Sequence, residues 1–217
     1  MDEQAQTRWD LLLLLSLLLV ILSYPLLDNG NVKRLVLGLL VFLPVILATV
    51  KLSQVKHWVW PSVLLMSSAI LTSLASVILQ SQLMTGIKWA ILAVFFAVTV
   101  VGLFDYLRKA RSVTNGHLFT AASIYLLLGM QWFALYGAIE VFLPDAFLRS
   151  SAVATDHQAE LLYFSLITLS TIGYGDIVPV NGEVRMLAAL EGITGVLYVA
   201  ITVALLVSAY KQPNNSS

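Results

Sequence analysis

The side chains that could carry covalent or metal chemistry are scarce in this sequence. The chain has no cysteine, which excludes disulfides, thiolate metal sites and cysteine nucleophiles. His57, His117 and His157 are far apart in the sequence and are expected in three separate loops, and neither an HExxH nor a GxSxG motif occurs. Any chemistry must therefore come from the main chain, from carboxylates and from hydroxyls. We expect a protein that is not an enzyme and that carries no cofactor.

One uncharged stretch stands out by its length. Leu161–Gly175 lies between Glu160 and Asp176 and has 15 residues, whereas a helix needs about 20 apolar residues to cross about 30 Å of hydrocarbon. The stretch also ends in a glycine-containing turn. A segment that is hydrophobic, short and broken is expected to be re-entrant, because it can enter and leave by the same face where it lines a cavity.

The rest of the chain predicts a membrane protein that holds this segment. Of the 217 residues 59% are hydrophobic and 11% are charged, and the mean hydropathy is +0.89, which excludes a soluble fold. The twelve Lys and Arg residues balance the twelve Asp and Glu residues, so we expect no nucleic-acid partner. We predict an all-α, polytopic protein with six transmembrane helices and a re-entrant helix before the last one. The six stretches are Leu11–Leu27, Leu35–Val50, Trp58–Ile87 (hydrophobic as far as Leu79), Trp89–Phe104 with an extension through Leu107, Leu118–Ile139 and Gly192–Tyr210.

Charges and aromatic residues suggest how these spans are oriented. If the N-terminus is cytoplasmic, seven Lys and Arg residues lie inside and five outside. The acidic segments around the re-entrant stretch then face outward. We expect a cell-membrane protein with both termini in the cytoplasm. The aromatic residues expected to anchor the spans at the membrane interface are Trp9, Trp58, Trp60, Trp89 and Tyr210.

The end of the re-entrant stretch resembles the selectivity filter of the potassium channel family. The run is Ser170-Thr171-Ile172-Gly173-Tyr174-Gly175-Asp176, and the family usually has Val at the place of Ile172. In that established mechanism backbone carbonyls replace the water around the ion, and they point inward only with unusual dihedrals that Gly173 and Gly175 permit. The resemblance implies a homotetramer that conducts K⁺ as the permeating ion. The carbonyls of Thr171, Ile172, Gly173 and Tyr174 and the Thr171 hydroxyl would then form the ion sites.

The same resemblance assigns roles around the filter. Leu161–Ser170 would form a helix whose negative C-terminal end is aimed at the ion. Tyr163 and Phe164 resemble the aromatic cuff that braces the filter tyrosine. Asp176 would form a ring of carboxylates at the outer mouth, and its role as a turn former is compatible with that. Glu191 is an ionisable residue at the outer end of the last span, and we expect it to support the filter from behind through hydrogen bonds.

The last span carries a candidate hinge and a candidate gate. Gly192 and Gly195 fall where family members keep a hinge glycine, and close helix packing is the alternative. Three valines recur every four residues and would line an apolar inner constriction that closes by losing its water, with core packing as the alternative. These valines are Val199, Val203 and Val207.

The front half of the chain lacks the charges of a voltage sensor. No Lys or Arg lies between Lys88 and Asp105, whereas a sensor needs about 3–4 gating charges per subunit. We expect conduction that depends weakly or not at all on voltage. The predicted parts are a sensor-like domain of four spans (1–107), a basic linker (108–116), a pore domain (117–210) and a short tail (211–217). The alternative function is a subunit with a pore fold that regulates or scaffolds other membrane proteins.

Overall fold

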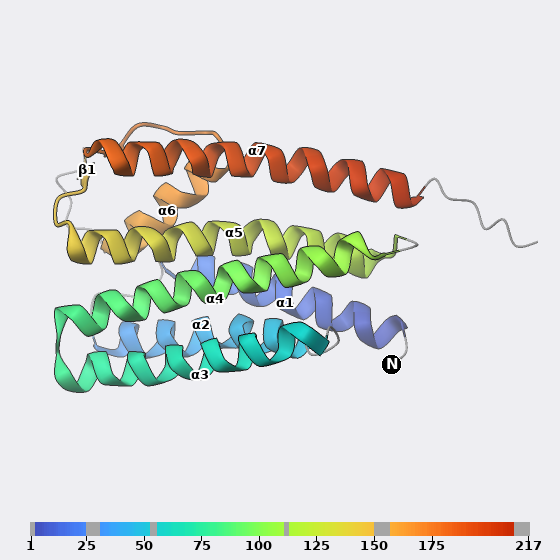
Figure 1. Ribbon diagram of the computed structural model, residues 1–217, viewed down its shortest axis with the longest axis horizontal. Helices are drawn as coiled ribbons and strands as arrows, with labels where there is room; N and C mark the ends of the chain where they lie inside the picture. Colours follow the sequence, from blue (N-terminus) through green and yellow to red (C-terminus); the bar gives the residue numbers. More distant parts are fainter. Residues whose placement is uncertain (1–2, 25–30, 53–55, 111–112, 150–156, 211–217) are drawn as a thin grey trace, which may run out of the picture.

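The chain folds into a bundle of long helices with one short helix at one end (Figure 1). The computed structural model describes residues 3–24, 31–52, 56–110, 113–149 and 157–210. Within them the prediction of a mainly helical protein is confirmed, with two three-residue strands in addition. The elements are α1 Glu3–Ser23, α2 Asn31–Leu52, α3 Lys56–Leu79, α4 Gln82–Arg108, α5 Asn115–Phe142, β1 Phe147–Arg149, α6 His157–Leu169, β2 Ile177–Pro179 and α7 Gly182–Tyr210.

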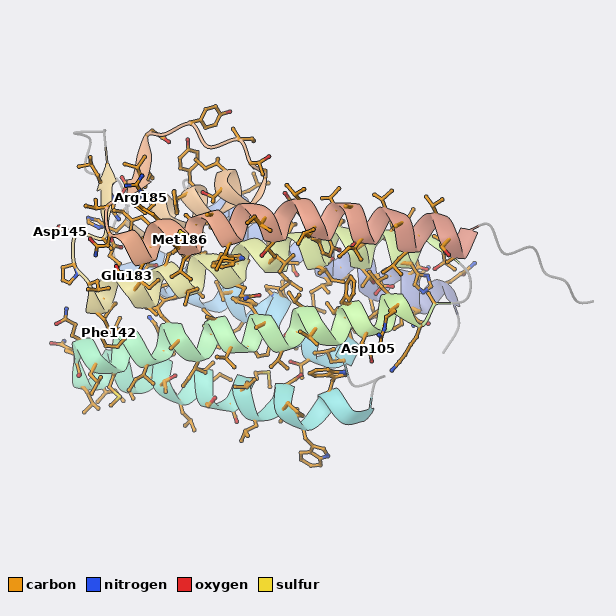
Figure 2. All side chains as sticks on the ribbon, turned by 45° about the horizontal axis from the view of Figure 1, so that its top comes forward. Asp105, Phe142, Asp145, Glu183, Arg185 and Met186 are labelled. Carbon is orange, nitrogen blue, oxygen red and sulfur yellow. The ribbon has the colours of Figure 1, made fainter. Side chains whose placement is uncertain are left out.

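The long helices run up and down between two ends of the bundle. α1 begins and α4 and α7 end at one end, which we name the inner end, while β1 lies at the opposite, outer end (Figure 1). Asp145, Glu183 and Arg185 lie at the outer end and Asp105 at the inner end (Figure 2). These four charged side chains thus lie near the ends of the bundle, as expected where helices cross a lipid layer.

Four of the described helices are long and apolar enough to cross a membrane. These four helices are α1, α4, α5 and α7. The helices α2 and α3 contain the shorter apolar stretches Leu40–Leu52 and Trp60–Ser76. These helices support a multi-pass membrane protein. The number of six spans stays a prediction.

α4 and α5 pack closely along most of their length because small residues face large rings. A Cβ on Gly137 would lie 2.9 Å from the Trp89 ring, and that ring packs edge-on against Phe133 at 5.1 Å between centroids. Trp89 is only 7% exposed, so the expectation of an interfacial anchor is wrong for this residue. Trp60, at 79% exposed, has the exposure expected of an anchor.

Two helices begin earlier than the uncharged stretches suggest. α4 starts at Gln82 and includes Lys88, and α7 starts at Gly182 and includes Glu183 and Arg185 in its first turns. Charged side chains near a helix end can reach water, so backbone hydrogen bonding continues through them. The length of an uncharged stretch therefore underestimates the length of the helix. Glu191 therefore lies inside α7, fully buried, and not at its outer end.

A buried ion pair joins the front helices at the inner end. Lys51 of α2 donates to Asp10 of α1, and its Nζ lies 4.3 Å from the centroid of the Tyr106 ring in α4. The Tyr106 hydroxyl accepts from Gln6 Nε2 at 3.1 Å, and its ring stacks on His117 at the start of α5. These contacts join four helices, and no sequence pattern indicated them because the residues involved are far apart in the chain.

Candidate functional site

The site is built on α6, a helix of 13 residues. At about 1.5 Å rise per residue such a helix reaches only about 20 Å into the bundle. The chain enters α6 from the outer end and returns there to begin α7 (Figure 1). One face of α6 is buried against the bundle, and its residues are Leu161, Leu162, Phe164, Ser165, Ile167 and Leu169. α6 and the loop after it are therefore re-entrant with respect to the long helices.

α6 ends in a Schellman motif formed by the first residues of the candidate filter. The amide of Ile172 donates to the Ile167 carbonyl at 2.9 Å, and the amide of Thr171 donates to the Thr168 carbonyl at 3.0 Å. This pair of bonds places Thr171 at the position that requires left-handed dihedrals, and its φ is +60°. A β-branched residue is rarely found there, and the conformation costs about 1 to 2 kcal/mol relative to right-handed backbone.

The two glycines of the candidate filter also have positive φ. Gly173 has φ +51° and Gly175 has φ +80°. A Cβ built on either would meet nothing within 4 Å. Glycine is therefore favoured at these two positions by the backbone dihedral and not by lack of space. Residues 171, 173 and 175 together give the alternating dihedrals that carbonyl coordination needs, with Thr171 as the member that the sequence did not indicate.

The candidate filter is open to one side in the single chain. Ile172 is 55% exposed and Tyr174 is 71% exposed. Between this loop and α7 lies an open cavity of about 480 Å³, whose lining includes Thr168, Thr171 and Gly173 on one side and Gly192, Ile193 and Val196 on the other. The loop is hydrogen-bonded to α6 on one side and exposed on the other.

A buried hydrogen-bond cluster connects α6 to α5 and α7. Glu191 of α7 accepts from the Tyr136 hydroxyl of α5 through Oε2 at 2.7 Å. The Ser165 hydroxyl of α6 lies 2.6 Å from Glu191 Oε1 and 2.8 Å from the Gly129 carbonyl. One carboxylate thus connects α5, α6 and α7. Sequence reasoning singled out Glu191 but missed Tyr136 and Ser165, since only the fold brings these hydroxyls to it.

The two aromatic residues expected to form the cuff face different neighbours. Phe164 is buried and packs edge-on against Tyr136 and Phe147. Tyr163 is 37% exposed, and its hydroxyl forms a hydrogen bond with the Asp176 carboxylate. The phenol is the donor in this bond, because a carboxylate oxygen accepts. Asp176 is thereby tied back to α6.

The two glycines of α7 differ in what they contact. A Cβ on Gly195 would lie 1.9 Å from the Leu169 carbonyl oxygen, whereas a Cβ on Gly192 would meet nothing closer than the Thr168 carbonyl oxygen at 3.6 Å. Gly195 thus permits α7 to touch the backbone at the end of α6. This contact favours the packing alternative for Gly195, while the hinge role of either glycine stays a prediction.

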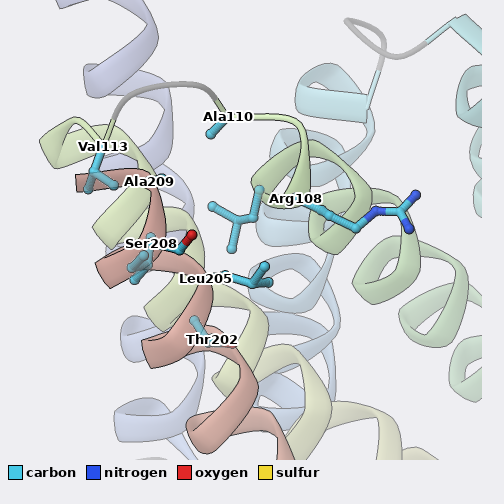
Figure 3. A pocket seen from close by; sticks show the side chains of 9 residues that line it. Arg108, Ala110, Val113, Thr202, Leu205, Ser208 and Ala209 are labelled. Atoms are coloured by element: carbon cyan, nitrogen blue, oxygen red, sulfur yellow. The ribbon is translucent and has the colours of Figure 1, made fainter. Parts of the chain in front are cut away.

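The rest of α7 has few contacts within the chain. Val199, Val203 and Val207 are each about half exposed, at 50%, 55% and 48%. The inner half is held by Tyr198, whose hydroxyl donates to the Ala121 carbonyl at 2.6 Å. Near the inner end a cavity of about 200 Å³ separates α7 from the end of α4 (Figure 3). The valines therefore present a broad apolar surface, and their role as a gate stays a prediction.

The back half of the chain matches a known family. Residues 118–212 match a family model described as an ion channel. This segment contains α6, the candidate filter and α7, together with nearly all of α5. No solved structure matches the chain closely.

Three curated relatives share part of this chain. The two pore potassium channel c of Oryza sativa subsp. japonica is 35% identical over 92 residues, 42% of this chain and 18% of the rice protein. The two pore potassium channel a of the same plant is 33% identical over 81 residues, 37% of this chain and 20% of that protein. The potassium voltage-gated channel subfamily KQT member 3 of Homo sapiens is 32% identical over 108 residues, 48% of this chain and 12% of the human protein. The chain therefore matches only a small part of each relative.

Proposed function

We propose that the protein belongs to the potassium channel family and is a potassium-selective channel, because residues 118–212 match a family model described as an ion channel and parts of the chain share 32 to 35% identity with segments of two potassium channels. Its ion sites are the carbonyls of Thr171, Ile172, Gly173 and Tyr174 with the Thr171 hydroxyl. K⁺ moves passively down its gradient as these oxygens replace its hydration water. The observation that carries the proposal is the run of positive φ at Thr171, Gly173 and Gly175 in a re-entrant loop.

Assembly into a homotetramer is part of the proposal, because one chain supplies only one quarter of a ring of carbonyls. The bare face of the loop supports this assembly, as does α7. In the single chain the apolar residues Ile193, Val196 and Val203 of α7 are each more than half exposed. Apolar side chains next to an open polar loop fit subunit contacts or a pore wall better than lipid alone.

The cluster around Glu191 supports a role in holding the filter. A carboxylate inside a membrane span is costly unless it is hydrogen-bonded. Here it is bonded on both oxygens, and it ties α6 to α5 and α7. We assign Glu191 to keeping α6 in position. Gly175 and Asp176 support the filter at its outer mouth.

The orientation and the gating class complete the proposal. Both termini lie in the cytoplasm and the loop opens to the outside, because this orientation leaves seven Lys and Arg residues inside and five outside. Residues 1–107 form a sensor-like domain without gating charges, since α4 has no Lys or Arg between Lys88 and Arg108. The channel is therefore proposed to open with weak or no dependence on voltage. Its candidate gate is the set Val199, Val203 and Val207, and its candidate hinge is Gly192 or Gly195.

The test is ion flux into liposomes that contain the purified protein. K⁺ and Rb⁺ are expected to enter and Na⁺ to be excluded. Equal Na⁺ and K⁺ flux would refute the proposed selectivity. An assembled protein that carries no flux would favour the alternative of a regulatory or scaffolding subunit.

Two alanine variants make this test specific for the loop. Gly173→Ala is expected to abolish selective flux, because alanine at φ +51° costs about 1 to 2 kcal/mol although the position has room. Gly182→Ala is the matched control, since a Cβ there also meets nothing within 4 Å and its φ is not in the left-handed range. Equal flux in the two variants would show that the loop is not the filter.

A further inference from the structure

An arginine at the outer end connects the two helices that flank the entry to α6. Arg149 of β1 donates through Nη2 to Glu140 near the end of α5, and its Nε lies 2.5 Å from Glu160 Oε2 in the first turn of α6. All three side chains are largely buried, at 15 to 19% exposed. One guanidinium with several fixed donors suits two carboxylates. It also offsets Glu140, whose charge is unfavourable at the C-terminal end of a helix.

The same residue lies opposite the point where the chain leaves the candidate filter. β1 and β2 pair antiparallel, with Arg149 opposite Ile177. Ile177 follows Asp176 directly. Beyond the pair, the Val180 amide donates to the Ala146 carbonyl at 2.9 Å. The segment that directly follows the filter therefore pairs with the strand that carries Arg149.

The ring of Phe147, two residues before Arg149, fixes β1 to α5 and α6. Phe147 is 4% exposed and meets Tyr136 of α5 and Phe164 of α6 edge-on, at 5.4 Å and 5.2 Å between ring centroids. β1 is thus anchored to α5 and α6 by its apolar side chain as well as by its charged one. A change at position 149 is expected to leave this apolar anchor in place.

We infer that Arg149 is a positioning residue for K⁺ binding: it fixes the outer end of the filter by holding β1 between Glu140 and Glu160. This inference rests on the proposed function. Its physical basis is that loss of the guanidinium removes the positive charge that lies between the partly buried carboxylates of Glu140 and Glu160. His157 lies near one of the two carboxylates, with its Nδ1 3.8 Å from Glu140 Oε1. Repulsion would move the two carboxylates apart and shift β1. Through the paired strand β2, this shift would reach Ile177 and Asp176.

The experiment measures how K⁺ protects the assembled protein against heat. An ion that binds only the folded filter stabilises it by RT ln(1 + c/Kd), where c is the K⁺ concentration, so a weaker affinity requires more K⁺ for the same protection. Wild-type protein, Arg149→Gln and Arg149→Lys are heated over a series of K⁺ concentrations at constant ionic strength. The K⁺ concentration that gives half of the protection is expected to rise at least about tenfold in Arg149→Gln, a loss of about 1.4 kcal/mol in K⁺ binding. For Arg149→Lys this K⁺ concentration is expected to lie between those of the wild type and Arg149→Gln. A lysine ammonium keeps the positive charge but lacks the planar fork that meets both carboxylates.

Two further variants separate the clamp from charge and from folding. The triple variant Glu140→Gln, Arg149→Gln, Glu160→Gln removes the repulsion together with the arginine, and its half-protecting K⁺ concentration is expected to fall back toward the wild-type value. Arg185→Gln removes an outer positive charge outside this cluster and is expected to leave the value unchanged. If Arg149→Gln does not assemble, the triple variant and Arg149→Lys still test the inference.

The outcomes are distinct from those of the flux test. If K⁺ protects the wild type and Arg149→Gln lowers heat stability equally at every K⁺ concentration, the residue is merely structural and the inference is overturned. A triple variant as impaired as Arg149→Gln overturns it as well. A wild type that K⁺ does not protect contradicts the proposed filter itself.

Discussion

Replacing Gly195 by alanine is the sharpest test of how α7 meets the filter. A Cβ at this position would lie 1.9 Å from the Leu169 carbonyl oxygen and 2.9 Å from its carbonyl carbon. Real Cβ atoms essentially never approach a heavy atom within 3.0 Å, so α7 and the end of α6 must separate by at least about 1.1 Å. A carbonyl oxygen cannot turn aside as a flexible side chain can. The strain therefore passes into the backbone.

The displacement is directed at the candidate ion sites. Leu169 is the last residue of α6, and Thr171 follows it in the Schellman motif. Overpacking of this kind costs about 1 to 3 kcal/mol, which exceeds the gain of up to about 1 kcal/mol that alanine brings to a helix. We expect Gly195→Ala to lower the ratio of K⁺ to Na⁺ permeability and the thermal stability of the assembled protein.

Gly192→Ala is the matched control in the same helix. Its Cβ would meet the Thr168 carbonyl oxygen at 3.6 Å, an ordinary contact, so the variant gains helix propensity without a clash. Rb⁺ uptake into liposomes with Na⁺ competition measures selectivity, and a thermal melt measures stability. If both variants keep wild-type selectivity and stability, the close approach of α7 to α6 is not needed. If Gly195→Ala changes only the open probability, Gly195 acts as a hinge.

Three further predictions address the buried cluster, the gate and voltage. Tyr136→Phe removes the 2.7 Å hydrogen bond to Glu191 at nearly constant volume, and a thermal melt is expected to show a loss of about 1 to 3 kcal/mol; an unchanged melt would mean that the bond is not needed. Val203→Ser and Val207→Ser are expected to raise basal Rb⁺ uptake with selectivity intact, because a polar ring holds water that an apolar ring loses; wild-type uptake in both would place the closed gate elsewhere. A charge that crosses the membrane field contributes about 2.3 kcal/mol per 100 mV, and a channel that moves no charge lacks this contribution. Its conductance in symmetric K⁺ is therefore expected to change little with voltage. A steep conductance-voltage curve in the absence of blockers would contradict the interpretation of α4 as a helix without gating charges.

Much of the candidate site followed from the sequence because its constraints are local. An uncharged stretch too short to span, ending at Gly173 and Gly175, predicted a re-entrant helix and a loop with unusual dihedrals. The structure has positive φ at both glycines. Dihedral preferences act within one residue, and span length acts along one helix, so neither depends on what lies elsewhere in the chain.

The ends of the helices could not be read from charge alone. Lys88, Glu183 and Arg185 interrupt the uncharged stretches, yet each lies inside a helix. A helix end is decided by where backbone hydrogen bonding stops, and a charged side chain near the membrane surface does not stop it. For this reason the last helix was expected to begin at Gly192, and Glu191 was placed at its end.

Only the tertiary structure decided which distant residues meet. Glu191 needs hydrogen-bond donors, but it took the packing of three helices to supply Tyr136 and Ser165. Trp89 is typical of an interfacial anchor in the sequence, yet it is buried because Gly137 on α5 leaves room for its ring. Local preferences determined what each segment can be, whereas burial and close approach depend on surfaces brought together by folding, and no single segment carries that information.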